Sequence, residues 1–234
     1  PVLSGNLDLS QSELLREEVE DYVILEVGGE RIGIVSALAT DTVETSSPGP
    51  NVIFQDEIES LRADVEALEA EGVTKIIALT HVGLPKDREI AAAVEGIDVV
   101  IGGHSHTLML NGDESNPSFP EMVGDVPVAQ AYAYSKYLGR LDITFDDAGN
   151  VTAVSGDPIL LDASVAEDEG IVARVAELTG PIEEMKARVV AETTDVIEGD
   201  RSVCRAVECP MGNLVADAML DRVADQGIQI ALQN

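Results

Sequence analysis

The stretch VTKIIALTHVGLPKDREIAAAVEGIDVVIGGHSHT, residues 73–107, contains the pattern on which the expected fold depends. Two short apolar runs, at 76–80 and 97–101, flank a segment whose composition favours a helix. Apolar runs of this kind, rich in β-branched residues, are typical of strands buried in a parallel sheet. Strand, helix and strand in this order predict an α/β fold.

All three histidines of the chain follow these two strands. His81 ends the first strand, and His104 and His106 come after the second, behind two glycines. Functional residues of α/β sheets gather outside the carboxyl ends of the strands, so the three side chains are expected at one edge. Glycine permits unusual backbone angles, which we expect the pair Gly102 and Gly103 to supply for convergence on one centre.

Neutral imidazole binds zinc, manganese or iron, so three histidines at one sheet edge indicate a metal site. A His-x-His motif by itself is weak evidence, because two polar residues of a surface loop give the same pattern. The third histidine strengthens the metal interpretation. From the residues alone, a single zinc ion on three imidazoles remains an alternative to a two-metal centre.

The segments around this stretch extend the α/β pattern. Residues 22–38 predict a hairpin with a Gly-Gly turn, and 54–72 predict an amphipathic helix ended by Gly72. Residues 126–154 alternate around a turn and predict antiparallel strands. Residues 165–190 predict a helical connector interrupted at Gly180 and Pro181, and a further helix beginning near Met211 leads into a final strand.

The chain is strongly acidic. Its 234 residues include 44 acids and 14 Lys and Arg, a net charge of -30. Such a surface repels nucleic acids and anionic membranes. Dispersed acids with few lysines and large aromatic residues indicate a protein kept soluble in high salt, which screens the self-repulsion. No apolar window is long enough to span a membrane, and a leader peptide cannot be assessed because the sequence does not begin with Met.

The charged residues near the histidines are assigned structural roles. Asp87 is expected to cap the helix that begins at residue 88, and Asp98 to face a turn at the start of the second strand. Lys86 and Arg88 are expected to be solvated. None of the four is predicted to bind a metal or substrate.

Four segments carry a family resemblance: IIALTHVGLPKDREIA, GIDVVIGGHSHT, residues 126–151 and CRAVECPMGNLVADAML. In order and spacing they resemble the 5′-nucleotidase family of calcineurin-like metallophosphoesterases. The resemblance implies a layered α/β/β/α sandwich, of which residues 1–163 form the C-terminal portion. It also implies a helical connector at 164–190 and the beginning of a second α/β, substrate-binding domain at 191–234.

The resemblance implies two divalent metal ions, with His81, His104 and His106 as ligands. Relatives carry their other metal ligands and a catalytic His-Asp pair in Asp-x-His, Gly-Asp and Gly-Asn-His-Glu motifs upstream. This sequence has no Asp-x-His or Gly-Asn-His-Glu motif, and its Gly-Asp pairs all lie after His106. We therefore expect a fragment that lacks both ends of the protein, contains no catalytic residue of its own and is close to inactive alone.

The resemblance also assigns residues in the C-terminal part. Cys204 and Cys209 match a closely spaced disulfide of extracellular members, which implies an extracellular, periplasmic or cell-surface location; two buried thiols are the alternative. Arg205 matches an arginine that contacts substrate, although an ordinary surface ion pair is the other interpretation. Asn234 matches the first residue of a substrate-binding motif.

Hydrolysis of a nucleotide phosphoester is the expected reaction, and the oligomeric state is left open. Within the family, a 2′,3′-cyclic-nucleotide phosphodiesterase, a nucleotide-sugar hydrolase and a thiosulfohydrolase are alternatives. A binding module that keeps the fold but has lost catalysis is an alternative of another class.

Overall fold

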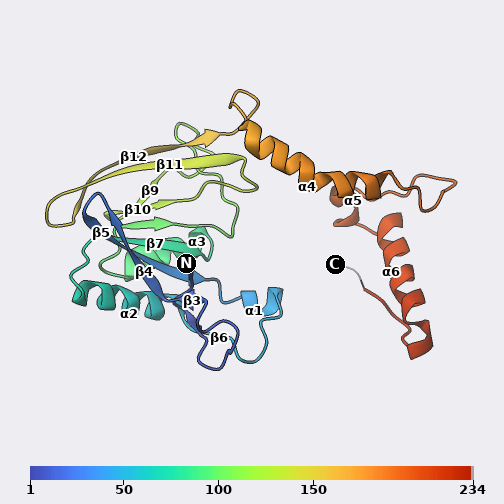
Figure 1. The fold of residues 1–234 in the computed structure, drawn as a ribbon, viewed down its shortest axis with the longest axis horizontal. Coiled ribbons are helices and arrows are strands. Elements are labelled where there is room, and N and C mark those ends of the chain that lie inside the picture. The colour runs from blue at the N-terminus through green and yellow to red at the C-terminus, as the bar shows by residue number, and fades with distance from the viewer. Residues whose placement is uncertain (233–234) are drawn as a thin grey trace. The chain divides into compact units, whose positions relative to one another are not determined.

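The structure is a computed structural model that describes residues 1–232. The chain divides into two compact units, Pro1–Ala166 and a second that begins at Glu167 (Figure 1). Among the helices of the described residues, none has both the length and the apolar character that a membrane-spanning segment needs.

A six-stranded sheet forms the centre of the first unit. Its spatial order is β4-β5-β7-β8-β10-β9. The strands are β4 (Tyr22–Val27), β5 (Glu30–Leu38), β7 (Ile76–His81), β8 (Val99–Ile101), β10 (Val126–Ala129) and β9 (Glu121–Val123). The four inner strands are parallel, whereas β4 and β9 pair antiparallel at the two edges. The predicted α/β fold is confirmed.

The hairpin of β4 and β5 is confirmed as predicted. Gly28 and Gly29 connect the strands with φ values of 62° and 91°. Positive φ at both positions gives the turn whose twist matches the flanking strands, and glycine adopts it without steric cost. Tyr22 pairs with Val35 and Val27 with Glu30, so the register is continuous.

Two helices, α2 (Glu57–Ala70) and α3 (Leu84–Ala93), pack on one face of the sheet. Helix α2 is confirmed as predicted. The side chain of Asp56 accepts hydrogen bonds from the first-turn amides of Ile58 and Glu59, both at 3.0 Å. Its apolar stripe is buried in the core: Leu61, Val65 and Leu68.

The hairpin of β11 (Tyr137–Phe145) and β12 (Val151–Leu160) lies on the side of the sheet opposite to α2 (Figure 1). The prediction of antiparallel pairing throughout 126–154 is only partly right. Strand β10 pairs antiparallel with β9 but parallel with β8. Most of its residues are buried, as suits an inner strand, whereas β11 and β12 alternate between exposed and half-buried residues.

The first unit is completed by short elements. These are β1 (Val2–Leu3), β2 (Leu7–Asp8), β3 (Val19–Glu20), α1 (Thr42–Thr45) and β6 (Ile53–Phe54). β1 pairs parallel with β3, and β2 pairs antiparallel with β6.

In the described residues of the second unit, all regular elements are helices. They are α4 (Glu169–Ala187), α5 (Arg201–Cys204), α6 (Pro210–Arg222) and a 3-10 turn at Ala224–Gln226. Two expectations are wrong here. Helix α4 continues through Pro181, since one proline removes only one amide donor. Residues 228–232 form no strand, because no described segment pairs with them.

Candidate functional site

The three histidines lie at the carboxyl edge of the parallel strands. His81 is the last residue of β7 and pairs in register with Leu38, the last residue of β5. β8 ends at Ile101, directly before the segment with His104 and His106. All three histidines are exposed there. Parallel strands thus bring together residues that are far apart in the sequence.

The rings of His81 and His104 are in contact. Their centroids are 5.2 Å apart and their planes are inclined by 77°. The ring of His106 instead makes an edge contact with Tyr134, also with 5.2 Å between centroids. The predicted meeting of His81 and His104 is therefore present in the structure, and His106 faces an aromatic side chain on a neighbouring loop.

The expected role of the two glycines is wrong. Gly102 and Gly103 are not among the residues with positive φ; His104 and His106 themselves adopt φ values of 72° and 52°. The glycines are needed for close approach. A Cβ on Gly103 would lie 3.0 Å from His81 Nδ1, and one on Gly102 would overlap the carboxyl group of Asp87.

Backbone strain is concentrated around the histidines. In the described chain, five non-glycine residues have positive φ, and all lie in residues 104–106 and 132–135: His104, His106, Tyr132, Tyr134 and Ser135. The two loops are joined by a hydrogen bond of 3.1 Å from the Tyr132 amide to the Thr107 carbonyl oxygen. Such conformations cost on the order of 1–3 kcal/mol each and cluster at functional sites.

The chemistry of the donors fits part of a metal-binding site. Partial desolvation of the exposed ring, with smaller contributions from His104 and His106, lowers the pKa of His81 and so favours the neutral ring that ligates metals. Within residues 1–232, however, no three ligand-type side chains converge closely enough to hold an ion without further ligands.

Two polar residues at this edge were not predicted. The Asp41 carboxylate lies 3.6 Å from His104 Nε2, and Asp41 follows β5 by three residues. Gln130 follows β10 and is 2% exposed, with its carboxamide bonded to residues 103–107. Their positions within three residues of the ends of parallel strands were the available signal, because the same edge rule applies to them.

The expectation that Asp87 caps helix α3 is wrong. The helix begins at Leu84 after Gly83, so Asp87 lies inside the first turn and is fully buried. It accepts a hydrogen bond from Thr80 Oγ1, and its Oδ2 has no partner among the described residues. Burial raises the pKa of Asp87 to about 6, partly offset by the Thr80 hydroxyl.

Asp98 and Arg88 also differ from expectation. Asp98 accepts a hydrogen bond of 2.7 Å from the Ile76 amide, and so ties the start of β7 to the segment before β8 instead of facing a turn. Burial raises the pKa of Asp98 to about 6. Arg88 is not simply solvated, since it forms a bidentate pair with Glu121 at 3.0 and 2.7 Å. Lys86 pairs with Glu89 at 2.7 Å.

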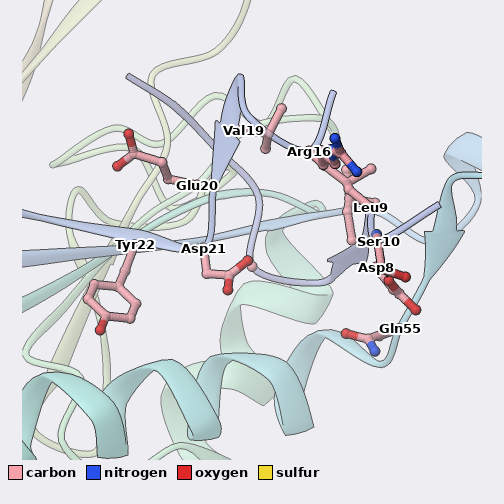
Figure 2. Close-up of a pocket in the computed structure, with 11 residues that line it drawn as sticks. Asp8, Leu9, Ser10, Arg16, Val19, Glu20, Asp21, Tyr22 and Gln55 are labelled. Carbon is pink, nitrogen blue, oxygen red and sulfur yellow. The ribbon is translucent and has the colours of Figure 1, made fainter. Parts of the chain in front are cut away.

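A cavity of about 620 Å³ lies elsewhere in the first unit (Figure 2). Three carboxylates line it, from Asp8, Glu20 and Asp21, against the single arginine Arg16. In the part of the chain that the structure describes, the histidines do not line this cavity. Its charge disfavours an anionic phosphoester, so the histidine edge is the stronger candidate.

The second unit contains the two cysteines. Cys204 ends α5, and Cys209 lies directly before α6, where its sulfur accepts a hydrogen bond from the Gly212 amide. The structure joins them by a disulfide. Arg205 lines a cavity of about 580 Å³ beside this bridge. Asn234 lies outside the described residues.

Comparison with known proteins gives a consistent result. The chain is 39% identical to a 5′-nucleotidase of Diplobatis ommata over 95% of its length, which is 40% of that protein. It is 38% identical to a snake venom 5′-nucleotidase of Crotalus adamanteus over 94% of the chain and 40% of the relative. The chain thus spans about 40% of the length of these relatives.

Solved structures agree with the sequence relatives. A crystal structure of a 5′-nucleotidase precursor from Thermus thermophilus superposes with a TM-score of 0.79 at 34% identity. The superposition covers 97% of this chain and 47% of that one. No family model matches the chain. Sequence similarity along nearly the whole chain, together with the shared fold, shows that it belongs to the 5′-nucleotidase family.

Proposed function

We propose that this chain forms part of a metal-dependent phosphoester hydrolase that acts on nucleotides, of the 5′-nucleotidase type. The observation that carries the proposal is the placement of all three histidines at the carboxyl edge of the parallel strands, with the rings of His81 and His104 in contact. Membership of the 5′-nucleotidase family supports the substrate class.

His81, His104 and His106 would supply ring nitrogens to a pair of divalent ions such as zinc or manganese. Bound divalent ions supply charge stabilisation for the phosphoryl oxygens and lower the pKa of a bound water. The rings of His81 and His104 are held at this edge by β7 and by the strained 102–107 loop. The Asp41 carboxylate lies 3.6 Å from His104 Nε2 and would orient the ring by charge attraction when Nε2 carries a proton.

The second unit is proposed to begin the substrate-binding domain. Arg205 would contact the substrate from the cavity beside the disulfide, since a guanidinium pairs well with a phosphate and the rest of the chain repels one. Asn234 is assigned to the same role on the family resemblance. Domain limits of 1–163, 164–190 and 191–234 are part of this proposal.

The remaining metal ligands and the catalytic His-Asp pair are proposed to lie in the portion of the relatives that this chain does not match. The 234-residue chain is then expected to be nearly inactive by itself. The disulfide, and relatives that include a snake venom protein, support an extracellular, periplasmic or cell-surface location.

The test compares metal content and phosphate release from AMP in a protein extended to the length of its relatives. His104→Ala is expected to lose bound metal and at least about 100-fold in rate. Removing a metal ligand costs more affinity and activity than removing a residue that supports a ligand. Thr152→Ala, in the β11–β12 hairpin, is the control and should behave as the unaltered protein. Equal metal content and equal rates in both variants would reject the proposal.

A further inference from the structure

Gln130 is a buried polar residue whose side chain bonds the loop of residues 103–107, called the histidine loop, at several points. It follows the last residue of β10 and is 2% exposed. Its Nε2 donates a hydrogen bond of 2.8 Å to the Gly103 carbonyl oxygen. Its Oε1 accepts from the Thr107 amide and, at 3.1 Å, from Ser105 Oγ. One carboxamide thus bonds three residues of the loop.

These contacts bracket both histidines. Gly103 precedes His104, Ser105 separates the two histidines, and Thr107 follows His106. Because both histidines have positive φ, the loop needs fixed points on either side to keep this conformation. Ser105 Oγ also accepts from the Leu84 amide at 3.1 Å, which connects the loop to the first turn of α3.

The chemistry of glutamine suits this role. A single side chain must donate to a carbonyl and accept from an amide at the same time, and a carboxamide does both without charge. Buried in this way, it has hydrogen-bond partners for both its oxygen and its nitrogen. The backbone amide of Gln130 is itself fixed by a contact of 3.1 Å with Met109 Sδ.

We propose that Gln130 is a positioning residue, which holds residues 103–107 in the conformation that presents His104 and His106 to a metal ion. The proposal rests on the proposed function, because it assigns these histidines to metal binding. Gln130 acts through the backbone of the loop and contacts neither metal nor substrate.

The test is a Co²⁺ titration of the protein extended to the length of its relatives, which supplies the remaining proposed ligands, followed by the visible absorption of imidazole-bound cobalt. Gln130→Met keeps the length of the side chain and removes its three hydrogen bonds to the loop. It is expected to weaken Co²⁺ binding by about 10–100-fold, the usual effect of removing a residue that supports a ligand. Gln130→Asn keeps the carboxamide but cannot reach every partner, and should lie between Gln130→Met and the unaltered chain.

Asn111→Ala is the matched control. The Asn111 carboxamide also bridges backbone groups, since it bonds the Phe119 carbonyl and amide at 2.8 and 3.0 Å and the Gly156 carbonyl at 2.9 Å. None of these groups belongs to the histidine loop. The control should lower the thermal midpoint without changing the cobalt dissociation constant, which separates positioning from a general loss of stability.

Three outcomes decide the matter. If the unaltered chain binds Co²⁺ and Gln130→Met binds it equally well, the positioning role is wrong. The same conclusion follows if Asn111→Ala weakens binding as much as Gln130→Met. If His104→Ala and the unaltered chain do not differ in cobalt binding, the proposed metal site itself is wrong. Should Gln130→Met fail to fold, the dissociation constant of Gln130→Asn decides in its place.

Discussion

At the scale of single residues, the missing side chain of Gly102 makes room for a buried carboxyl group. A Cβ at this position would overlap Asp87 Oδ2 and lie 2.7 Å from its Cγ. Asp87 is fully buried and bonded to Thr80, so it cannot swing into solvent. Thr80 and Gly102 precede the two histidine segments, and this packing fixes the distance between them.

Gly102→Ala is therefore expected to destabilise the protein by about 1–3 kcal/mol, the usual cost of overfilling a packed site. Urea denaturation measures the loss. Gly180→Ala is the control: apart from the backbone of its own helix, no atom lies within 4 Å of that Cβ position, and alanine favours the helix it occupies. The double variant Gly102→Ala/Asp87→Ala should lose less than the sum of its parts. Additive losses would contradict the proposed clash.

Asp64 is a second residue whose surroundings set its chemistry. It lies on α2, is 8% exposed, and its Oδ2 has no partner among the described residues. Burial, with a smaller contribution from Asp21, raises the pKa of Asp64 to about 7. The folded state thus holds this proton more tightly than the unfolded state, and the stability that it contributes is lost as the pH rises.

The free energy of unfolding should therefore fall between about pH 4 and pH 7, and this slope should be smaller in Asp64→Asn. At full value, the shift in the pKa of Asp64 corresponds to a change of about 4 kcal/mol in the free energy of unfolding. We expect a change of about 2 kcal/mol, because part of the carboxyl group reaches water. Urea denaturation at about pH 4, 5.5, 7 and 8 measures it. Parallel pH curves for the two proteins would show that Asp64 titrates normally.

At the scale of elements, helices α2 and α4 have similar beginnings but different packing. Asp56 caps α2 and Asp168 caps α4 through a hydrogen bond to the Ile171 amide. Helix α2 buries its apolar stripe in the core, whereas no residue of α4 is buried. The first turn of α2 is consequently coupled to the stability of the whole first unit.

Removing each N-cap should show this difference in packing between α2 and α4. Asp56→Ala is expected to lower the unfolding free energy of the first unit by about 1 kcal/mol, the typical value of an N-cap. Asp168→Ala should leave that unit unchanged and increase amide exchange only at the start of α4. Hydrogen exchange by mass spectrometry reports both. A global loss in Asp168→Ala would show that α4 contributes to the core.

At the scale of the whole molecule, repulsion among the acidic side chains is the main electrostatic effect. The net charge is -30, and basic residues pair with acids on the surface, as in Arg62–Glu59 and Lys186–Glu183. Exposed pairs of this kind contribute little individually. The remaining acids repel one another over a distance set by the salt concentration.

The thermal midpoint should rise as KCl is increased from about 0.1 to about 1 M, because the screening length falls from about 10 to about 3 Å. Differential scanning calorimetry over this series measures the rise, and a globular protein of balanced charge measured alongside provides the control. A midpoint that stays constant or falls would contradict the interpretation of the acidic surface as an adaptation to high salt.

The sequence by itself determined the α/β class, the β4–β5 hairpin, helix α2 and the meeting of His81 and His104 at one edge. These features depend on local periodicity, turn residues and the rule for parallel strands. The tertiary structure decided which strands β10 joins, where Asp87 is buried, and that Gln130 and Asp41 reach the histidine loop. The contacts of Gln130 and Asp41 join groups far apart in the sequence, as the Gln130 side chain and the Gly103 carbonyl are, 27 positions from one another. A local sequence pattern cannot predict a contact between residues so far apart in the sequence, because only the packed sheet brings these groups together.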